Sequence, residues 1–325
     1  MLKSNFENYP KGERSFRMLV DFLGHGIFNS DGEEWKCQRK QASYEFSKRS
    51  LRNFMVDTVQ SEIAHRLLPL LRRAGEKGET DTVGDATSSN FMRAFEEAQN
   101  LIVGRFMDAF EITWRVKKLL DIGSERRLRE LLAVVHGILS TRPDVEKKIL
   151  EEVRSVRIIN KNTSETFSFD ELREMHYLHA AVTESMRLYP PVPMDTQSCL
   201  EDDTMPDGTF VGKGWFVTYS AYAMGRLEDI WGRDCNEYKP ERWLENGVFN
   251  PESPFRFPVF HAGPRMCLGK EMAYVQMKSI VACVVERFEI DVVGKEKTPE
   301  HVLSLTLRMK GGLPIKVKEK VKQCC

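Results

Sequence analysis

Apolar residues recur at helical spacing through much of the first part of the chain. In residues 60–71 they stand three or four positions apart, which places them on one face of a helix. Similar patterns predict further helices, over residues 33–52, 91–110 and 124–139. A polar stretch rich in glycine, serine and threonine, residues 75–90, predicts a loop between two of these helices. We therefore expect this part of the chain to be mostly helical.

Two local signals predict where later helices begin. Pro143 has a fixed backbone angle that suits the first turn of a helix, so a helix over residues 144–153 is expected to start there. Ser168-Phe-Asp-Glu171 has the form of a capping box, in which the two end residues bond each other's backbone N–H groups. The helical region that this box opens is expected to end at Leu188, because prolines follow.

Beyond those prolines the pattern changes from helical to extended. Glycine-containing turn signals flank short apolar runs at residues 210–211 and 215–219, which predict a β-hairpin. Helical spacing returns after Gly269, and alternating segments at 303–309 and 313–317 predict a second hairpin around a Gly–Gly turn. The expected fold is mainly α with small β-sheets (α+β), in a single domain over residues 1–325.

Composition limits the classes of protein to consider. Hydrophobic residues make up 41% of the 325 residues, which is enough to build a buried core. Lys+Arg and Asp+Glu both number 48, so no basic excess indicates nucleic-acid binding. We find no apolar run long enough to span a bilayer and no apolar core of a signal peptide. As written, the chain is expected to be soluble and cytoplasmic.

Seven cysteines are scattered along the chain, and no two of them form a Cys-x-x-Cys pair. Their odd number and scattered spacing disfavour both a disulfide scaffold and a structural zinc site. Most of them are expected to be small buried hydrophobic residues. Cys267 differs because of the unusual local sequence around it.

Residues 260–269 have the form Phe-x-x-Gly-x-Arg-x-Cys-x-Gly, in which five demanding residues stand at fixed spacing. A cysteine thiolate in such a loop can ligate haem iron axially. A helical pattern begins just after Cys267, and the positive end of a helix favours a thiolate over a thiol. The sequence therefore predicts that Cys267 is a metal ligand.

The other residues of this motif suit the same chemistry. Gly263 and Gly269 are expected to let the backbone approach a flat macrocycle and to adopt positive φ angles. Arg265 supplies a permanent cation suited to a carboxylate such as a haem propionate. Phe260 offers an apolar wall that would shield the sulfur and tune its potential.

With this motif the chain resembles the cytochrome P450 family of haem-thiolate monooxygenases. Glu184 and Arg187 match the family's Glu-x-x-Arg helix motif, and Arg242 lies in a matching Pro-Glu-Arg-Trp segment. By itself an i,i+3 Glu–Arg pair is usually a surface contact that contributes little. The resemblance instead implies a buried structural network in which Arg242 closes on the Glu184–Arg187 pair.

An earlier segment matches the family's Trp-x-x-x-Arg helix motif, with Trp35 and Arg39. Alone this motif is weak, because a core tryptophan and a solvated arginine explain it equally well. The resemblance implies that both side chains bond a haem propionate. Between Trp35 and Asn53 six Lys or Arg stand against one Glu. These residues form either a solvated helix face or, as the resemblance implies, a basic patch that docks an acidic reductase.

The segment 191–243 is similar to the plant fatty-acid hydroxylases of the family, which include enzymes acting on jasmonoyl-isoleucine. This resemblance implies haem b as cofactor and electrons from NADPH through a separate cytochrome P450 reductase. It also implies dioxygen and a fatty-acid-like small molecule as substrates. The turn at residues 307–311 would border the substrate channel. Family members are held on the endoplasmic reticulum membrane.

The sequence departs from the family pattern in two places. The N-terminal anchor has no counterpart before the Trp35 segment. The long distal helix, with its acid and alcohol over the haem, should precede Pro143, but the sequence there leaves no room for it. A weak match at residues 84–87 is interpreted as loop. The P450 fold is therefore expected to be incomplete, without a catalytic acid–alcohol pair. Two functions stay open: a monooxygenase, or a non-catalytic remnant that binds haem weakly or not at all.

Overall fold

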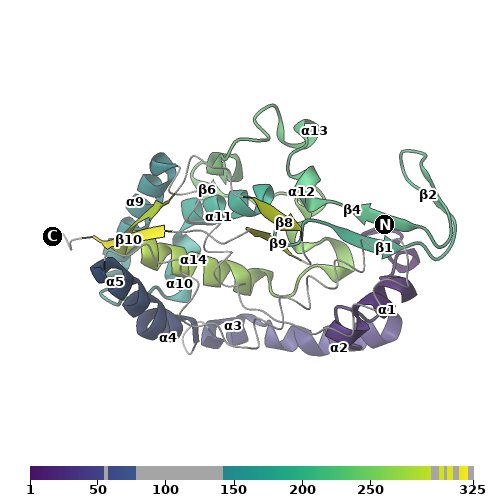
Figure 1. The fold of residues 1–325 in the computed structure, drawn as a ribbon, viewed down its shortest axis with the longest axis horizontal. Coiled ribbons are helices and arrows are strands. Elements are labelled where there is room, and N and C mark those ends of the chain that lie inside the picture. The colour runs from purple at the N-terminus through teal and green to yellow at the C-terminus, as the bar shows by residue number, and fades with distance from the viewer. Residues whose placement is uncertain (55–57, 78–141, 294–299, 304–305, 310–314, 321–325) are drawn as a thin grey trace.

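The computed structural model describes residues 1–54, 58–77, 142–293, 300–303, 306–309 and 315–320 (Figure 1). The N-terminal part is a succession of helices: η1 (Phe6–Asn8), α1 (Gly12–Leu23), α2 (Gly32–Glu45), α3 (Lys48–Phe54), α4 (Gln60–Glu62), the π-helical η3 (Ile63–Leu67) and α5 (Leu68–Lys77). In Figure 1 these helices follow one edge of the molecule, and α14 (Lys270–Arg287) passes through its centre.

The predicted helices in this part are confirmed in type and corrected in their limits. The helix expected over 33–52 is interrupted at Phe46 and Ser47, so it forms α2 and α3. The helix expected over 60–71 continues to Lys77, so the first residues of the predicted loop 75–90 are helical. Several predictions lie outside the described residues. They are the helices over 91–110 and 124–139, the rest of that loop and the absence of a distal helix before Pro143.

Both predicted helix starts after Pro143 are confirmed. Pro143 occupies the first turn of α9 (Pro143–Asn160). Ser168 and Glu171 form the capping box of α10 (Phe169–Glu174), with the Glu171 N–H donating to Ser168 Oγ at 3.2 Å and the Ser168 N–H donating to Glu171 Oε2 at 2.7 Å. After a break at Met175, α11 (His176–Leu188) completes the predicted helical region.

The main hydrophobic core lies where α9, α11 and α14 pack together. Each helix contributes apolar residues at helical spacing, among them Val145, Ile149 and Val153 from α9, Leu178 and Val182 from α11, and Val281, Ala282 and Val285 from α14. All of them are almost completely buried, and burying one large apolar side chain stabilises the fold by about 1.5–3 kcal/mol. This core holds α11, which carries Glu184 and Arg187, and α14, which begins directly after Gly269.

The strands form two-stranded antiparallel sheets, and their pairing differs from the prediction. The strand β3 (Phe210–Val211) pairs with β2 (Asp203–Thr204), and β4 (Phe216–Tyr219) pairs with β1 (Asp195–Ser198). The predicted hairpin of 210–211 with 215–219 is therefore wrong. β2 was missed because two polar residues carry no alternating pattern.

The second predicted hairpin is also wrong. The strand β9 (Leu307–Met309) pairs with β8 (His301–Leu303), and β10 (Ile315–Glu319) pairs with β7 (Phe288–Val292) at the end of α14. The Gly–Gly turn itself lies outside the described residues. The remaining short elements are α12 (Ala221–Met224), α13 (Glu228–Trp231), η4 (Pro240–Trp243), β5 (Leu244–Glu245), β6 (Val248–Phe249), η5 (Pro258–Phe260) and η6 (Gly263–Arg265). No helix in the described part of the chain has the length and hydropathy needed to cross a bilayer.

Candidate active site

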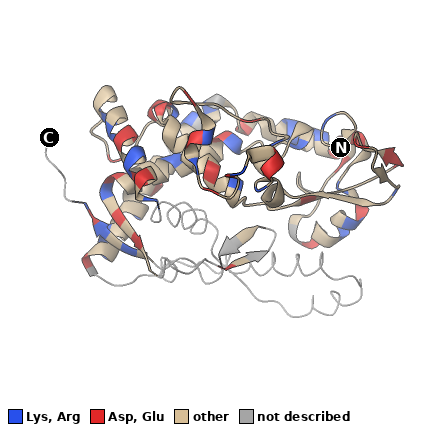
Figure 2. Ribbon diagram, turned by 90° about the horizontal axis from the view of Figure 1, so that it is seen from above, with Lys and Arg blue, Asp and Glu red and all other residues tan. Residues whose placement is uncertain are grey.

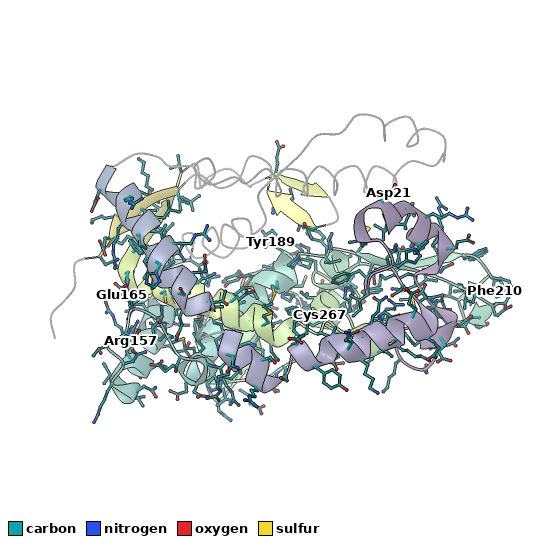
Figure 3. The ribbon with its side chains drawn as sticks, turned by 90° about the horizontal axis from the view of Figure 1, so that it is seen from below. Asp21, Arg157, Glu165, Tyr189, Phe210 and Cys267 are labelled. Carbon is teal, nitrogen blue, oxygen red and sulfur yellow. The ribbon has the colours of Figure 1, made fainter. Side chains whose placement is uncertain are left out.

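Cys267 lies in a short loop between η6 and the start of α14 (Figure 3). Its backbone N–H donates to the Phe260 carbonyl at 2.8 Å, which closes the loop on itself. The cysteine is exposed, as a thiol that binds an external metal must be. Gly269 is the N-cap of α14, so the predicted position of Cys267 just before a helix is confirmed.

The two glycines of this loop, residues 263–269, differ in conformation. Gly263 has φ +68°, a left-handed angle that favours glycine, as expected. Gly269 has φ −82°, so the expectation of a positive φ there is wrong. Its missing side chain serves another purpose, because a Cβ at Gly269 would stand 3.3 Å from Cε1 of Phe46 and 3.8 Å from the Cys267 sulfur.

Arg265 is held on one side of the loop by the N-terminal segment. Its Nη2 donates to the Ser30 carbonyl at 3.0 Å and to the Asp31 carboxylate. Asp31 in turn accepts the backbone N–H groups of Lys11 and Gly12, both at 3.0 Å. Burial lowers the pKa of the Arg265 guanidinium, although the negative charge of Asp31 opposes that shift. Arginine stays protonated in proteins, so Arg265 is a buried cation beside the cysteine loop.

Trp35 and Arg39 of α2 reach the same loop. Trp35 is buried, and the guanidinium carbon of Arg265 lies 4.5 Å from the centre of a Trp35 ring. Arg39 donates from Nη2 to the carbonyl of Met266, the residue before the cysteine. Burial lowers the pKa of Arg39, and its proximity to Cys267 opposes that shift. The structure therefore brings together Trp35, Arg39 and Arg265, which the sequence places far apart.

Phe260 is placed at the other end of the loop. Its ring lies 5.5 Å from that of Tyr274 on α14 and packs against the main core. The hydrogen bond from the Cys267 N–H to its carbonyl keeps Phe260 beside the cysteine backbone.

Phe46 is a residue of the site that the sequence did not single out. Along α2 the shielded residues are Trp35, Gln38, Arg39, Ala42 and, at the C-cap, Phe46, while the residues between them are exposed. These positions form one helix face, because they are separated by three, four or seven residues. Phe46 follows Trp35 by three turns on this face, and this helical spacing could have revealed it.

Glu184 of α11 is fully buried and lies at the centre of a second cluster, to which α11 and η4 contribute. Arg187 binds its carboxylate with Nε at 2.7 Å and Nη2 at 2.8 Å. Arg242 Nε donates to Oε1 at 2.9 Å, the Trp243 indole donates to Oε2 at 2.9 Å, and the Lys239 N–H donates to Oε1 at 2.9 Å. The network that the resemblance implied, with Arg242 closing on the Glu184–Arg187 pair, is thus present.

The remaining donors of Arg187 fix the long connection that follows α12. Nη1 donates to the carbonyls of Gly225 and Cys235, the latter at 2.6 Å, and Nη2 donates to the Glu237 carbonyl at 2.9 Å. Gly225 must be glycine, because a Cβ there would stand 2.3 Å from the Arg187 carbonyl oxygen. Since Glu184 and Arg187 have no exposed side-chain surface, both charges are compensated inside the protein.

The basic residues of α2 and α3 are mostly exposed, among them Lys36, Lys40 and Arg49. Arg52 bonds Asp170 through two N–H groups, and Lys36 pairs with Glu33. Basic and acidic residues are mixed over much of the described ribbon (Figure 2). Of the turn expected to border a substrate channel, residues 307–309 form β9, and the rest lies outside the described residues.

The residues present fit a haem-thiolate group. The Nε of Arg265 is buried and has no hydrogen-bond partner within the part of the chain that the structure describes, so a carboxylate could satisfy it. Arg39 supplies a second cation, and both flank an exposed thiol. This donor set matches a ligand that carries carboxylates and binds sulfur through a metal.

Comparison with known proteins agrees with this geometry. The chain matches the family model described as Cytochrome P450 over residues 132–315. It is 43% identical to cytochrome P450 CYP94D108 of Paris polyphylla, over 98% of this chain and 82% of that protein. It is 37% identical to cytochrome P450 94C1 of Arabidopsis thaliana over 98% of this chain and 82% of that protein, and 36% identical to cytochrome P450 94A2 of Vicia sativa over 98% and 80%.

These alignments are longer than the chain. The alignment with the Paris polyphylla protein covers 407 positions, whereas this chain has 325 residues. The relatives therefore contain internal segments that have no counterpart here.

Proposed function

Because this chain belongs to the cytochrome P450 family of monooxygenases, we propose that Cys267 is its haem-iron ligand and that it hydroxylates a fatty-acid-like substrate. The observation that supports the ligand assignment most strongly is that Trp35 and Arg39 of α2 contact the cysteine loop. Trp35 lies against Arg265, and Arg39 bonds the Met266 carbonyl. Two cations, and a buried N–H that has no partner among the described residues, stand next to an exposed thiol, although Arg39 and Arg265 are 226 positions apart in the sequence.

When bound, haem would supply the activation of dioxygen that inserts one oxygen atom into a C–H bond. The side chains of this protein position that group. Cys267 would ligate the iron through its sulfur and supply electron density to it, and Arg39 and Arg265 would bind the carboxylates of the group. Trp35 stacks against Arg265 and fixes its direction. The Glu184 network holds the connection between α12 and η4, which leads to the cysteine loop.

For the substrate we propose a fatty acid or fatty-acyl conjugate, oxidised near the end of its chain. The support is the resemblance of residues 191–243 to plant fatty-acid hydroxylases and the similarity to three plant P450s over nearly the whole chain. Electrons would come from NADPH through a cytochrome P450 reductase at the endoplasmic reticulum membrane. The exposed basic residues of α2 and α3 would provide the docking surface for that reductase.

A second candidate function is favoured by the length of the alignments. A chain that lacks internal segments of its relatives could lack the distal acid and alcohol, which would leave a protein that binds haem weakly or not at all. This remnant would keep the cysteine loop and the Glu184 network, because both are present in the structure.

The experiment is an absorption spectrum of purified protein, reduced and treated with carbon monoxide. A red-shifted Soret band of the thiolate type, together with hydroxylated fatty-acid product that requires NADPH and reductase, would support the monooxygenase. Protein without haem, or haem without product, would support the remnant.

The matched variants are Cys267→Ser and Cys283→Ser. Cys283 is fully buried, and burial raises the pKa of its thiol to about 12, so it is a poor ligand. Loss of the thiolate band only in Cys267→Ser is expected. An identical response in both variants would exclude Cys267 as the ligand.

A further inference from the structure

The ring of Phe46 contacts the spot next to the Cys267 sulfur. The three atoms nearest to a Cβ built at Gly269 would be Cε1 of Phe46 at 3.3 Å, the Cys267 sulfur at 3.8 Å and Cζ of Phe46 at 4.0 Å. The ring and the sulfur therefore flank the same small volume above the start of α14. φ at Gly269 is in the ordinary negative range, so the backbone does not require glycine there. What glycine provides at residue 269 is the space that a side chain would fill.

The geometry points to a positioning role for Phe46: with Gly269 it forms a packed contact that fixes the cysteine loop and covers one side of the Cys267 sulfur. This inference extends the proposed function, because Cys267 is the proposed ligand. The contact is made by residues of the protein alone, so it can be tested in the haem-free chain.

Three side chains of α2 contact the loop in sequence order. Trp35 lies against Arg265, Arg39 donates to the Met266 carbonyl, and Phe46 lies against Gly269. The helix therefore fixes the loop before and after the cysteine. Phe46 is the apolar end of this set, and its ring is partly shielded from solvent, unlike that of its neighbour Tyr44, which is 65% exposed.

Shielding the sulfur has a chemical consequence. An aromatic wall keeps water and small electrophiles away from a thiolate and lowers the local polarity, which tunes its reactivity and its potential as a ligand. Phe260 covers the loop from the side of the core, and Phe46 covers it from the side of α2. Removing the Phe46 ring should uncover a further side of the already exposed Cys267 residue, and it leaves the hydrogen bonds of Arg39 and Arg265 in place.

The first test measures alkylation of Cys267 by iodoacetamide in the haem-free full-length chain at one pH. The background carries Cys37→Ser, Cys324→Ser and Cys325→Ser, which removes the other exposed cysteine and the two at the C-terminus. Phe46→Ala should raise the alkylation rate of Cys267 several-fold, and Phe46→Tyr should leave it close to the parent. Tyr44→Ala is the matched control, because that ring stands two residues before Phe46, off the contact face, and is exposed.

Alkylation of Cys283 in the same samples reports global opening, because this thiol is fully buried in the core. A rise at Cys267 with no rise at Cys283 supports a local shield. Equal rises at both cysteines would mean that Phe46→Ala only loosens the fold, and an unchanged rate at Cys267 would mean that the ring covers nothing. Either of these results would overturn the inference.

The second test is a double-mutant cycle on the stability of the haem-free protein. Gly269→Ala should destabilise the chain, because the new methyl group would press on the Phe46 ring, and this loss should shrink in a Phe46→Leu background. Additive losses would show that the two residues do not touch. Failure of the parent chain to take up haem would refute the proposed function, but it would not affect either of these measurements.

Discussion

Replacing Glu184 with glutamine tests whether the buried cluster on α11 holds the fold together. The carboxylate accepts hydrogen bonds from Arg187, Arg242, Lys239 and Trp243, and its side chain is completely buried. Glutamine has nearly the same shape, but it presents an NH2 group to some of these donors and carries no charge. The Arg187 guanidinium would then be a buried cation without its counter-charge.

The size of the effect follows from these contacts. Each buried donor left without an acceptor costs about 1–3 kcal/mol, and breaking a buried ion pair from one side costs about 3–5 kcal/mol. The two estimates describe the same loss and are not added. We expect Glu184→Gln to lower the free energy of unfolding by about 3–5 kcal/mol, a large part of the 5–15 kcal/mol typical of a whole protein.

The assay is urea unfolding of the haem-free protein followed by tryptophan fluorescence. Trp243 donates directly to Glu184, so its emission reports on the cluster as well as on global unfolding. The control is Asp170→Asn, which removes an exposed partner of Arg52 and should change stability very little. A loss in Glu184→Gln no larger than that of the control would refute the reasoning.

Two further predictions concern pH and helix capping. The His179 ring is stacked on Tyr274 at 4.1 Å, and burial, together with the charge of Lys278, lowers its pKa from 6.5 to about 3. Below about pH 6.5 the unfolded chain takes up a proton on His179, whereas the folded chain does not. The free energy of unfolding should therefore fall by up to about 1.4 kcal/mol per pH unit between pH 6.5 and 3. Urea titrations of His179→Phe should show a smaller slope. An unaltered slope would contradict the assignment. Ser168→Ala removes the capping box of α10 and should lower the free energy of unfolding by about 1 kcal/mol, as measured by thermal or urea unfolding. Ser43→Ala, on the exposed face of α2, should lower it clearly less. Equal losses in the two variants would show that the cap contributes nothing.

Local signals in the sequence predicted local structure well. Pro143 and the Ser168–Glu171 box mark real helix starts, because their effect depends only on residues within one turn. The position of Cys267 just before α14 was also predictable for this reason. The interruption of the first predicted helix at Phe46 was not, because the sequence has no proline or glycine there.

Strand pairing could not be predicted in the same way. The turns at Gly208 and Gly214 are real, with φ +88° and +79°, but the strands beside them pair with other partners. The strand β2 contains only Asp203 and Thr204, and Asp203 is held by the Tyr9 hydroxyl at 2.7 Å, a contact across 194 positions. No local pattern carries such information.

In the candidate site, too, local features could be predicted from the sequence and long-range contacts could not. The motif around Cys267 and the Glu184–Arg187 pair could be recognised from spacing, since each lies within ten residues. The pairing of Arg265 with Asp31 was not foreseen, and neither was the role of Phe46, because both depend on how α2 and the N-terminal segment lie against the cysteine loop.

The hydrogen bond from Arg39 to Met266 joins residues 227 positions apart, and this separation has a consequence for biosynthesis. During translation α2 leaves the ribosome long before the cysteine loop is made, so its side chains have no partner for most of that time. Closing so long a loop is slow compared with forming the helices themselves. The contacts between α2 and the cysteine loop therefore form late in maturation, and a cofactor that needs them would bind only after residue 266 has been synthesised.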